Sequence, residues 1–305
     1  MLKKRLISAA IVLSVIALLV WAELWLGSPE TLGRPGLVLF GCCLVVGLMA
    51  ASEMLYFNKD VASQIQHWPA MTGTAFVIVL AFVPVWWQAY PADCPIGHLG
   101  WILYGVVAAL GLALISQILK YQPGNRVFDN VARTVLVPAY VGVLISFWSP
   151  IRALYDNEWG MLALLSLFVT VKLSDVMAFT IGKSFGKHRL APNLSPGKTV
   201  EGLVGGLLGG CLGAVIVFYL FAPWLTGTST AAPWWAVVIF GLVVAIVGVA
   251  GDLSVSLFKR EGGVKDSSRW LPGLGGIMDM VDSVLPAGPV VYAFWATGSF
   301  GPVVT

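Results

Sequence analysis

The chain has 305 residues, of which 58% are hydrophobic and only 11% are charged, and its formal net charge is +3. Soluble domains carry about 25% charged residues, so this composition excludes an ordinary globular domain. The small net charge gives no indication of nucleic-acid binding, and we expect no nucleic-acid partner. The four cysteines form no CxxC pair, so we expect neither a disulfide framework nor a cysteine-bound metal.

Several apolar runs reach the roughly 20 residues that a helix needs to cross a bilayer. We therefore predict an all-α polytopic membrane protein with nine transmembrane helices. The first run continues to Leu26 without a clean small-residue cleavage site, so we expect a retained helix rather than a signal peptide. Clusters of proline, glycine and polar residues separate the runs. The predicted spans are 6–26, 36–56, 69–88, 98–119, 129–148, 158–181, 200–223, 234–257 and 281–299.

Lysine and arginine are distributed unevenly between the two sides that these spans define. Fifteen of the 18 lie on the side of the N-terminus, whereas only Arg34 and Arg152 lie on the other. Because cytoplasmic loops are enriched in basic residues, this asymmetry predicts a cytoplasmic N-terminus and an odd number of spans. The two most basic loops, 182–199 and 258–280, then face the same compartment.

We divide the chain into four N-terminal spans at 1–120 and a C-terminal region at 121–305 that carries both basic loops. The seventh span contains glycines at every fourth residue, which favours close packing of helices in lipid. In the sixth span Lys172 and Asp175 are three residues apart, so each reduces the cost of the other's charge. Whether this pair is structural or catalytic stays open. The glycines are Gly202, Gly206 and Gly210.

Three aspartates flank the last basic loop. Asp252 lies near the end of the eighth span, and Asp279 and Asp282 would share one face at the start of the ninth. Charges beside lipid are costly and usually mark an ion, substrate or proton site. Mg²⁺ prefers carboxylates together with water and substrate phosphates, so the three aspartates predict a metal site. Helix capping by Asp279 or Asp282 is the alternative.

Bases and glycines fill the loop between these aspartates. Lys259 and Arg260 end the eighth span, and Lys265 follows five residues later. Anchoring in the inner leaflet is one role for such bases. Glycine-rich backbone at 262–263 and 273–276 favours instead a close approach to phosphate oxygens. We therefore predict that this loop holds a polyphosphate beside the metal.

The other basic loop precedes the seventh span. Its segment 195–199 reads SPGKT but is no P-loop, because position 192 is proline instead of glycine and no strand is expected before it. Lys198 and Thr199 stand directly before a helix, where backbone N–H groups can bind an anion. His188 is expected to contact the loop or a phosphate rather than a metal, because no partner histidine is near.

These segments resemble the phosphatidate cytidylyltransferase family, also called CDP-diacylglycerol synthases, and the clear similarity covers about residues 172–290. The family signature is S-x-x-K-R-x4-K-D-x-S-x2-L-P-x-H-G-G-x-x-D-R-x-D, and the Gly-Asp before it is also present at 251–252. Two positions differ from the signature. Leu274 replaces its histidine, and Met280 replaces the arginine that follows the first aspartate of its final D-R-x-D segment. The matching residues are Ser256, Lys259, Arg260, Lys265, Asp266, Ser268, Leu271, Pro272, Gly275, Gly276, Asp279 and Asp282.

The resemblance implies transfer of CMP from CTP to phosphatidate, giving CDP-diacylglycerol and pyrophosphate, with Mg²⁺ as cofactor; a second, monovalent cation stays open. It also implies a multi-pass protein of a bacterial inner membrane whose active site faces the cytoplasm. The catalytic residues would be Asp252, Lys259, Arg260, Lys265, Asp279 and Asp282, with Asp252, Asp279 and Asp282 holding the metal. The substrate-binding residues would be Asp175, Lys183, His188, Ser195, Lys198, Thr199, Ser256, Asp266, Gly275 and Gly276.

Three other functions remain as alternatives. A CTP-dependent lipid-alcohol kinase, similar to dolichol or phytol kinases, would use the same charges but release CDP instead of pyrophosphate. A transporter is compatible with the charged pair in the sixth span, although the polar residues gather in two loops on one side and no internal repeat is visible. A catalytically inactive relative is compatible with Leu274 and Met280. The sequence also leaves a homodimer open.

Overall fold

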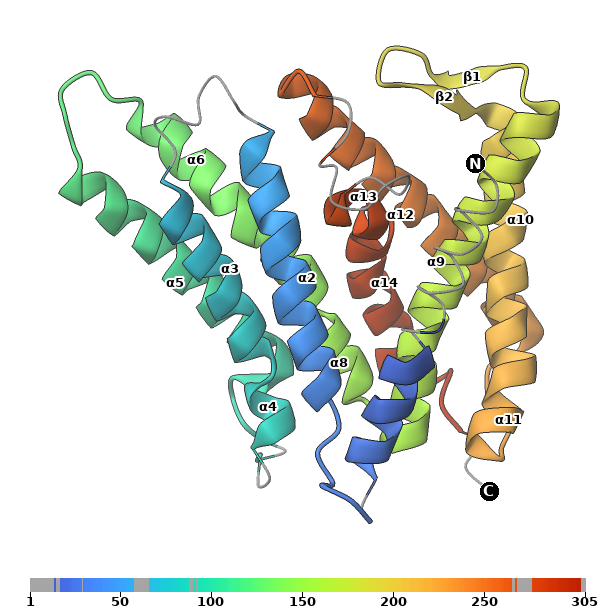
Figure 1. Cartoon of the computed structure of the whole chain (residues 1–305). Coiled ribbons are helices and arrows are strands. Elements are labelled where there is room, and N and C mark those ends of the chain that lie inside the picture. Colours follow the sequence, from blue (N-terminus) through green and yellow to red (C-terminus); the bar gives the residue numbers. More distant parts are fainter. Residues whose placement is uncertain are drawn as a thin grey trace.

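The computed structural model describes residues 14, 17–28, 30–57, 66–87, 90–91, 93–264, 267 and 276–302. It is a bundle of long helices with one small β-hairpin (Figure 1). The long helices are α2 (Leu37–Tyr56), α3 (His67–Ala81), α5 (Gly97–Leu119), α6 (Val127–Val137), α9 (Asn157–Phe185), α10 (Val200–Ile216), α12 (Trp234–Glu261) and α14 (Val284–Ala296). The short helices are α4 (Val83–Trp86), α7 (Val143–Ser146), α8 (Trp148–Arg152), α11 (Ala222–Thr226) and α13 (Ile277–Val281).

Among the described residues, eight helical stretches are long and apolar enough to cross a membrane. They correspond to the second to ninth predicted spans, and the predicted class, an all-α polytopic membrane protein, is confirmed. Nearly half of the predicted first span lies outside the described residues, and its described part falls in the short apolar helix Ala17–Gly27, so the count of nine stays a prediction. The stretches are Leu37–Tyr56, His67–Trp86, Gly97–Leu119, Val127–Arg152, Asn157–Phe185, Val200–Thr226, Trp234–Glu261 and Ile277–Ala296.

Two of these stretches change their hydrogen-bonding pattern part-way along, from α-helical to π-helical. Between α6 and α7 the turn Pro138–Gly142 is π-helical, and a second π-helical turn, Val217–Phe221, joins α10 to α11. Proline has no N–H group, so Pro138 cannot complete the α-helical ladder at its position. The two local changes leave the spanning helices long enough to cross the bilayer.

The helices form two groups. Helices α3, α5 and α6 pack together on one side of the bundle, and α9, α10 and α12 pack on the other, with α2 and α14 between them (Figure 1). The division at residue 120 stays a prediction, although α6 packs on α3 and α5 despite following that boundary.

Helices α9 and α10 approach each other closely through the predicted glycines. A Cβ atom on Gly202 would lie 2.9 Å from the Ala178 carbonyl oxygen of α9, and one on Gly210 would lie 2.6 Å from the Gly241 carbonyl oxygen of α12. These separations leave no room for a side chain, so the packing role predicted for the glycine repeat is confirmed.

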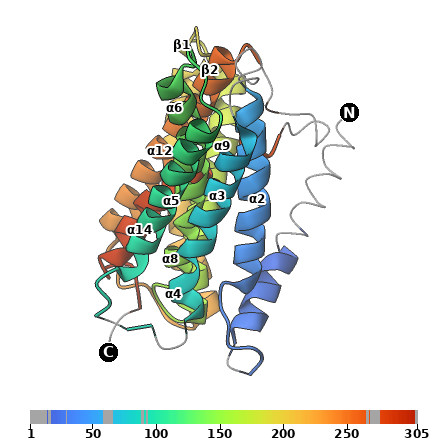
Figure 2. The same ribbon diagram turned by 90° about the vertical axis from the view of Figure 1, so that its left-hand side faces the viewer.

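The β-hairpin and the ends of α2, α9 and α12 lie at one end of the bundle, which we call the hairpin end (Figures 1 and 2). The hairpin pairs β1 (Arg189–Ala191) antiparallel with β2 (Ser195–Thr199). We expected a loop without strands here, and this expectation is wrong. Strands of three and five residues, with prolines inside the segment, show no alternating hydrophobic pattern by which the sequence could reveal them.

At the opposite end, a buried carboxylate caps α2. Glu23 accepts hydrogen bonds from the backbone amides of Val38 at 3.0 Å and Leu39 at 3.1 Å, and Arg152 Nε lies 3.1 Å from Glu23 Oε1. Both charged side chains are almost fully buried. Because a buried charge is costly without a partner, this ion pair ties the helix Ala17–Gly27 to α8 and α2.

Candidate active site

Helices α9 and α12 carry charged side chains within their apolar, membrane-spanning stretches. The 29 residues of α9 make it about 43 Å long at 1.5 Å per residue, which exceeds the roughly 30 Å of a bilayer's hydrocarbon core. Lys172 and Asp175 lie in the half of α9 nearer the hairpin end, and Asp252 lies in the corresponding half of α12. Charged side chains at this depth are expected to face protein or water rather than lipid.

An ion pair joins the first basic loop to α12, the helix that leads into the second. Lys198 on β2 places its Nζ atom 2.7 Å from Asp252 Oδ2 on α12, and both side chains are partly buried. One helical turn further along α12, the Ser256 hydroxyl lies 3.5 Å from Asp252 Oδ1, the outer limit of a hydrogen bond. The structure therefore brings together two parts of the chain that the sequence predicted only to share a side of the membrane.

A second pair connects α9 to α13. Lys172 Nζ lies 3.2 Å from Asp175 Oδ2 and donates a 2.9 Å hydrogen bond to the carbonyl oxygen of Met280. This contact spans 108 residues of sequence. The pair that the sequence left open is thus part of the contact between α9 and the signature segment.

Asp282 lies between α13 and α14 and is 7% exposed. Its Oδ1 atom accepts hydrogen bonds from the backbone amide of Ser283 at 2.7 Å and from the Ser283 hydroxyl at 3.1 Å. Its carboxyl group also interacts electrostatically with Asp252, Lys172 and Asp175. We call Lys172, Asp175, Lys198, Asp252 and Asp282 the charge cluster.

Asp279 has a separate set of partners. Lys259 Nζ lies 2.6 Å from its Oδ1 atom, while its Oδ2 atom accepts hydrogen bonds from the Ser267 hydroxyl at 2.8 Å and from the Gly276 amide at 3.3 Å. The hydrogen bond to Gly276 at the start of α13 means that the alternative role of helix capping is partly realised. Asp279 therefore fixes Lys259 and its own helix.

The three aspartates predicted to hold a metal are thus divided between two sets of partners. Asp252 and Asp282 belong to the charge cluster, and Asp279 belongs to the ion pair with Lys259. Within the described part of the chain, no three His, Cys, Asp or Glu side chains are gathered so that they could hold a metal ion together. Binding by all three would require the Lys259 ion pair to open, and the metal site stays a prediction.

The hairpin carries the remaining predicted residues of the first basic loop. His188 Nδ1 lies 2.6 Å from Glu201 Oε1 and is exposed, and Thr199 caps α10 by accepting the Gly202 amide at 3.1 Å. Ser195 begins β2 opposite Ala191. None of these contacts reaches the charge cluster.

Arg260 and Lys183 lie near this hairpin. Arg260 Nε donates to the Leu194 carbonyl oxygen at 3.1 Å, which ties the end of α12 to the hairpin, and Lys183 Nζ lies 5.7 Å from the centre of the Phe179 ring. Gly276 is the N-cap of α13. Lys265, Asp266 and Gly275 fall outside the described residues.

Comparison with known proteins identifies the family of this chain. A sequence profile described as the cytidylyltransferase family matches residues 3–297. The chain belongs to the cytidylyltransferase family. The resemblance that we derived from the signature residues is therefore confirmed.

Curated relatives within the cytidylyltransferase family have bacterial origins. The chain is 36% identical over 256 residues to the phosphatidate cytidylyltransferase of Bacillus subtilis, which covers 84% of this chain and 92% of the relative. It is 34% identical over 207 residues to that of Haemophilus influenzae, and this match covers 65% of this chain and 69% of the relative. It is 32% identical over 245 residues to the phosphatidate cytidylyltransferase of Pseudomonas aeruginosa, and this match covers 77% of this chain and 74% of the relative.

One residue of this cytidylyltransferase that contacts the signature segment was missed by sequence reasoning. Glu53 on α2 is 6% exposed and accepts hydrogen bonds from the backbone amides of Ile277 and Met278 on α13. An acidic residue within an apolar span is the signal that could have drawn attention to it. Its partners could not be found in the same way, because they lie 224 and 225 residues away.

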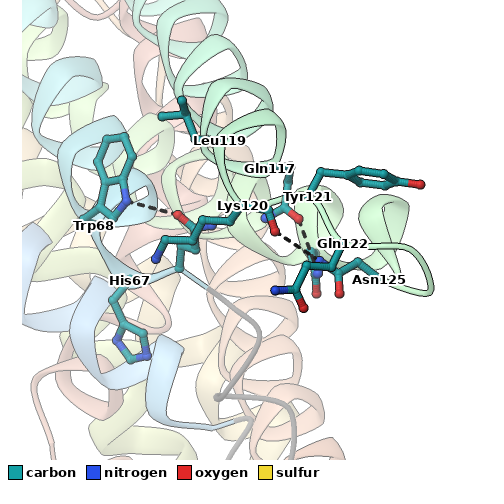
Figure 3. Close-up of a pocket in the computed structure, with 10 residues that line it drawn as sticks. His67, Trp68, Gln117, Leu119, Lys120, Tyr121, Gln122 and Asn125 are labelled. Atoms are coloured by element: carbon teal, nitrogen blue, oxygen red, sulfur yellow. Dashed lines mark hydrogen bonds between the residues drawn. The ribbon is translucent and has the colours of Figure 1, made fainter.

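A polar cavity lies outside the charge cluster, between the ends of α3, α5 and α6 (Figure 3). Its volume is about 870 Å³, and its walls include His67, Trp68, Lys120 and Tyr121. Trp68 Nε1 donates to Gln66 Oε1 at 3.1 Å within it. None of the predicted site residues lines this cavity.

Proposed function

We propose that the chain is a phosphatidate cytidylyltransferase that transfers CMP from CTP to phosphatidate and releases pyrophosphate. The curated relatives carry this name, and the match to the family profile runs through nearly the whole chain. The structural observation that carries the proposal is the contact between Lys198 and Asp252. It joins the hairpin of the first basic loop to α12, the helix that leads into the second, and this grouping of acids and bases supports a reaction between two anionic substrates.

The reaction joins a phosphate oxygen of phosphatidate to the α-phosphorus of CTP. The bond from that phosphorus to the oxygen bridging the α- and β-phosphates breaks, and pyrophosphate leaves with the bonding electrons. The attacking phosphate is already ionised at neutral pH, so no side chain has to remove a proton. The protein's task is therefore to align two anions and to screen their repulsion, which are the main sources of rate in this chemistry.

The cations of the site can provide that screening. Lys198 and Lys172 form ion pairs with carboxylates of the charge cluster, and Lys259 forms an ion pair with Asp279. In each pair the carboxylate fixes the position of the ammonium group before substrate arrives. Held in this way, the lysines would bind the phosphates of CTP and phosphatidate with little loss of side-chain freedom.

The donor atoms fit Mg²⁺ in kind. Asp252 and Asp282 offer hard carboxylate oxygens in one cluster, and Mg²⁺ commonly binds to one or two carboxylates while substrate phosphates and water complete its shell. We propose these two residues as its protein ligands, with Asp279 available only after Lys259 moves. When bound, the ion would neutralise charge that develops on the phosphates.

We further propose an inner-membrane location with the hairpin end in the cytoplasm. Lys183, Lys198, Lys259 and Arg260 lie in the elements that meet at this end, and Lys187 lies between α9 and β1. Such an excess of basic residues is typical of the cytoplasmic side. CTP would then reach the charge cluster from the compartment in which it is made.

The proposal is tested with purified protein in detergent, phosphatidate, each of the four nucleoside triphosphates in turn, and Mg²⁺ present or absent. We expect release of pyrophosphate only when CTP and phosphatidate are present together, with CMP incorporated into the lipid. Release of CDP with phosphorylation of a lipid alcohol would establish the kinase instead. Flux of solute in liposomes without either product would indicate a transporter, and folded protein without any activity would contradict the proposal.

A further inference from the structure

Helix α13 begins against a carboxylate from the other half of the chain. Glu53 Oε1 accepts the Ile277 amide at 3.0 Å, and Glu53 Oε2 accepts the Met278 amide at 2.9 Å. These are amides of the first turn, which have no partner within a helix. A carboxylate at this position both satisfies the amides and interacts favourably with the helix dipole.

Two side chains at this contact pack tightly against the backbone of Gly276. A Cβ atom on Gly276 would lie 2.4 Å from Glu53 Oε2 and 2.1 Å from the Ser267 hydroxyl oxygen. Only glycine fits between the two side chains. Glu53 and Gly276 together therefore fix where α13 starts and in which direction it runs.

The position of α13 matters because this helix and the residue after it provide three groups of the candidate site. Asp279, on this five-residue helix, holds Lys259; the Met280 carbonyl receives Lys172; and Asp282 follows directly after its last residue. A displacement of α13 would move all of these groups together. The helix is too short to hold its position by its own hydrogen bonds, so it depends on its external contacts.

We propose that Glu53 is a positioning residue for CMP transfer, which acts by holding α13 so that its groups meet the two substrates. The inference rests on the proposed function. Glu53 does not need to touch substrate, because both of its carboxylate oxygens are directed to backbone amides of α13. In reactions that depend on alignment, a displacement of about 1 Å can lower the rate by about 10²-fold.

The test compares Glu53 with a buried glutamate of the same kind. Glu23 also lies in an apolar helix and accepts backbone amides at the start of a long helix, but at the opposite end of the bundle. Glu53→Gln, Glu53→Asp, Glu53→Ala and Glu23→Gln are purified, and kcat and KM for CTP and phosphatidate are measured per folded protein. Hydrogen–deuterium exchange is followed in the segment 276–283.

We expect Glu53→Ala to lower kcat by about 10²-fold with a much smaller change in KM, because alignment and not substrate binding is lost. Glu53→Gln, which keeps one carbonyl oxygen, should lose less, and Glu53→Asp should recover part of the rate. Exchange of the 277 and 278 amides should accelerate in the alanine variant. Glu23→Gln should lower thermal stability while leaving kcat and exchange at 276–283 unchanged.

The inference is overturned if Glu53→Ala keeps the wild-type kcat, or if Glu23→Gln lowers kcat as much as Glu53→Gln does. If the alanine variant does not fold, the glutamine variant and its exchange data decide, since glutamine is nearly isosteric. Failure of the proposed function would be seen separately, because the unaltered protein would then release no pyrophosphate from CTP. In that case faster exchange at 277 and 278 in Glu53→Gln still tests the anchoring of α13.

Discussion

The ion pair between Lys259 and Asp279 should be one of the strongest single interactions at the hairpin end. Its atoms are 2.6 Å apart, and the side chains are only 13% and 18% exposed. Two unit charges at this separation attract by about 6 kcal/mol at an effective dielectric constant of about 20. The cost of removing both groups from water offsets much of that attraction. Lys259→Met removes the cation from Asp279 and leaves, among its described partners, Ser267 and Gly276, and we expect a loss of about 3 kcal/mol of stability.

A double-mutant cycle measures the interaction itself. Lys259→Met, Asp279→Asn and the double variant are unfolded by denaturant in detergent, and the coupling free energy is obtained from the four stabilities. We expect a coupling of about 2 kcal/mol, so that the double variant is more stable than the sum of the single effects predicts. Additive effects, with a coupling below about 0.5 kcal/mol, would refute the reasoning, because they would mean that the two groups do not form a partly buried pair.

Two further changes test the charge cluster and the packing around it. Lys172→Met should lower kcat by about tenfold or more, because it removes the cation that pairs with Asp175 and donates to the Met280 carbonyl oxygen. Adding Met280→Arg should restore part of the rate by returning a cation to the signature position. Steady-state assays of both variants check this. Gly213→Val should cost about 1–3 kcal/mol in thermal unfolding, because its Cβ would meet the Thr170 backbone at 2.8 Å and force α9 and α10 apart. A stability equal to that of the unaltered protein would show that the glycine contact is not tight.

The spanning helices could be predicted from sequence because their signal is local. An apolar run of about 20 residues has few structural solutions in a bilayer, so the eight described stretches agree with the predicted spans to within a few residues. The distribution of lysine and arginine then predicted that two distant loops share one side. The contact of Lys198 with Asp252 agrees with that prediction.

The division of the aspartates could not be predicted from spacing alone. A separation of three residues places Asp279 and Asp282 near one face of a helix, and residues 282 and 283 keep helical dihedral angles between α13 and α14. The two carboxylates nevertheless have different partners, because Asp279 pairs with Lys259 whereas Asp282 interacts with the charge cluster. The anchoring of α13 by Glu53 was equally hidden, because it depends on packing between residues more than 200 positions apart.

Two aspartates of this chain provide a matched pair for the central test. Asp252 lies in the charge cluster, whereas Asp156 caps α9 at the opposite end by accepting the Trp159 amide at 2.8 Å, a role that asparagine performs equally well. Pyrophosphate release from CTP and phosphatidate is measured for Asp252→Asn, Asp156→Asn and the unaltered protein, each with its folded fraction determined. We predict that release is lost in Asp252→Asn and retained in Asp156→Asn. Full release by folded Asp252→Asn would contradict the assignment of the charge cluster as the site where CTP and phosphatidate react.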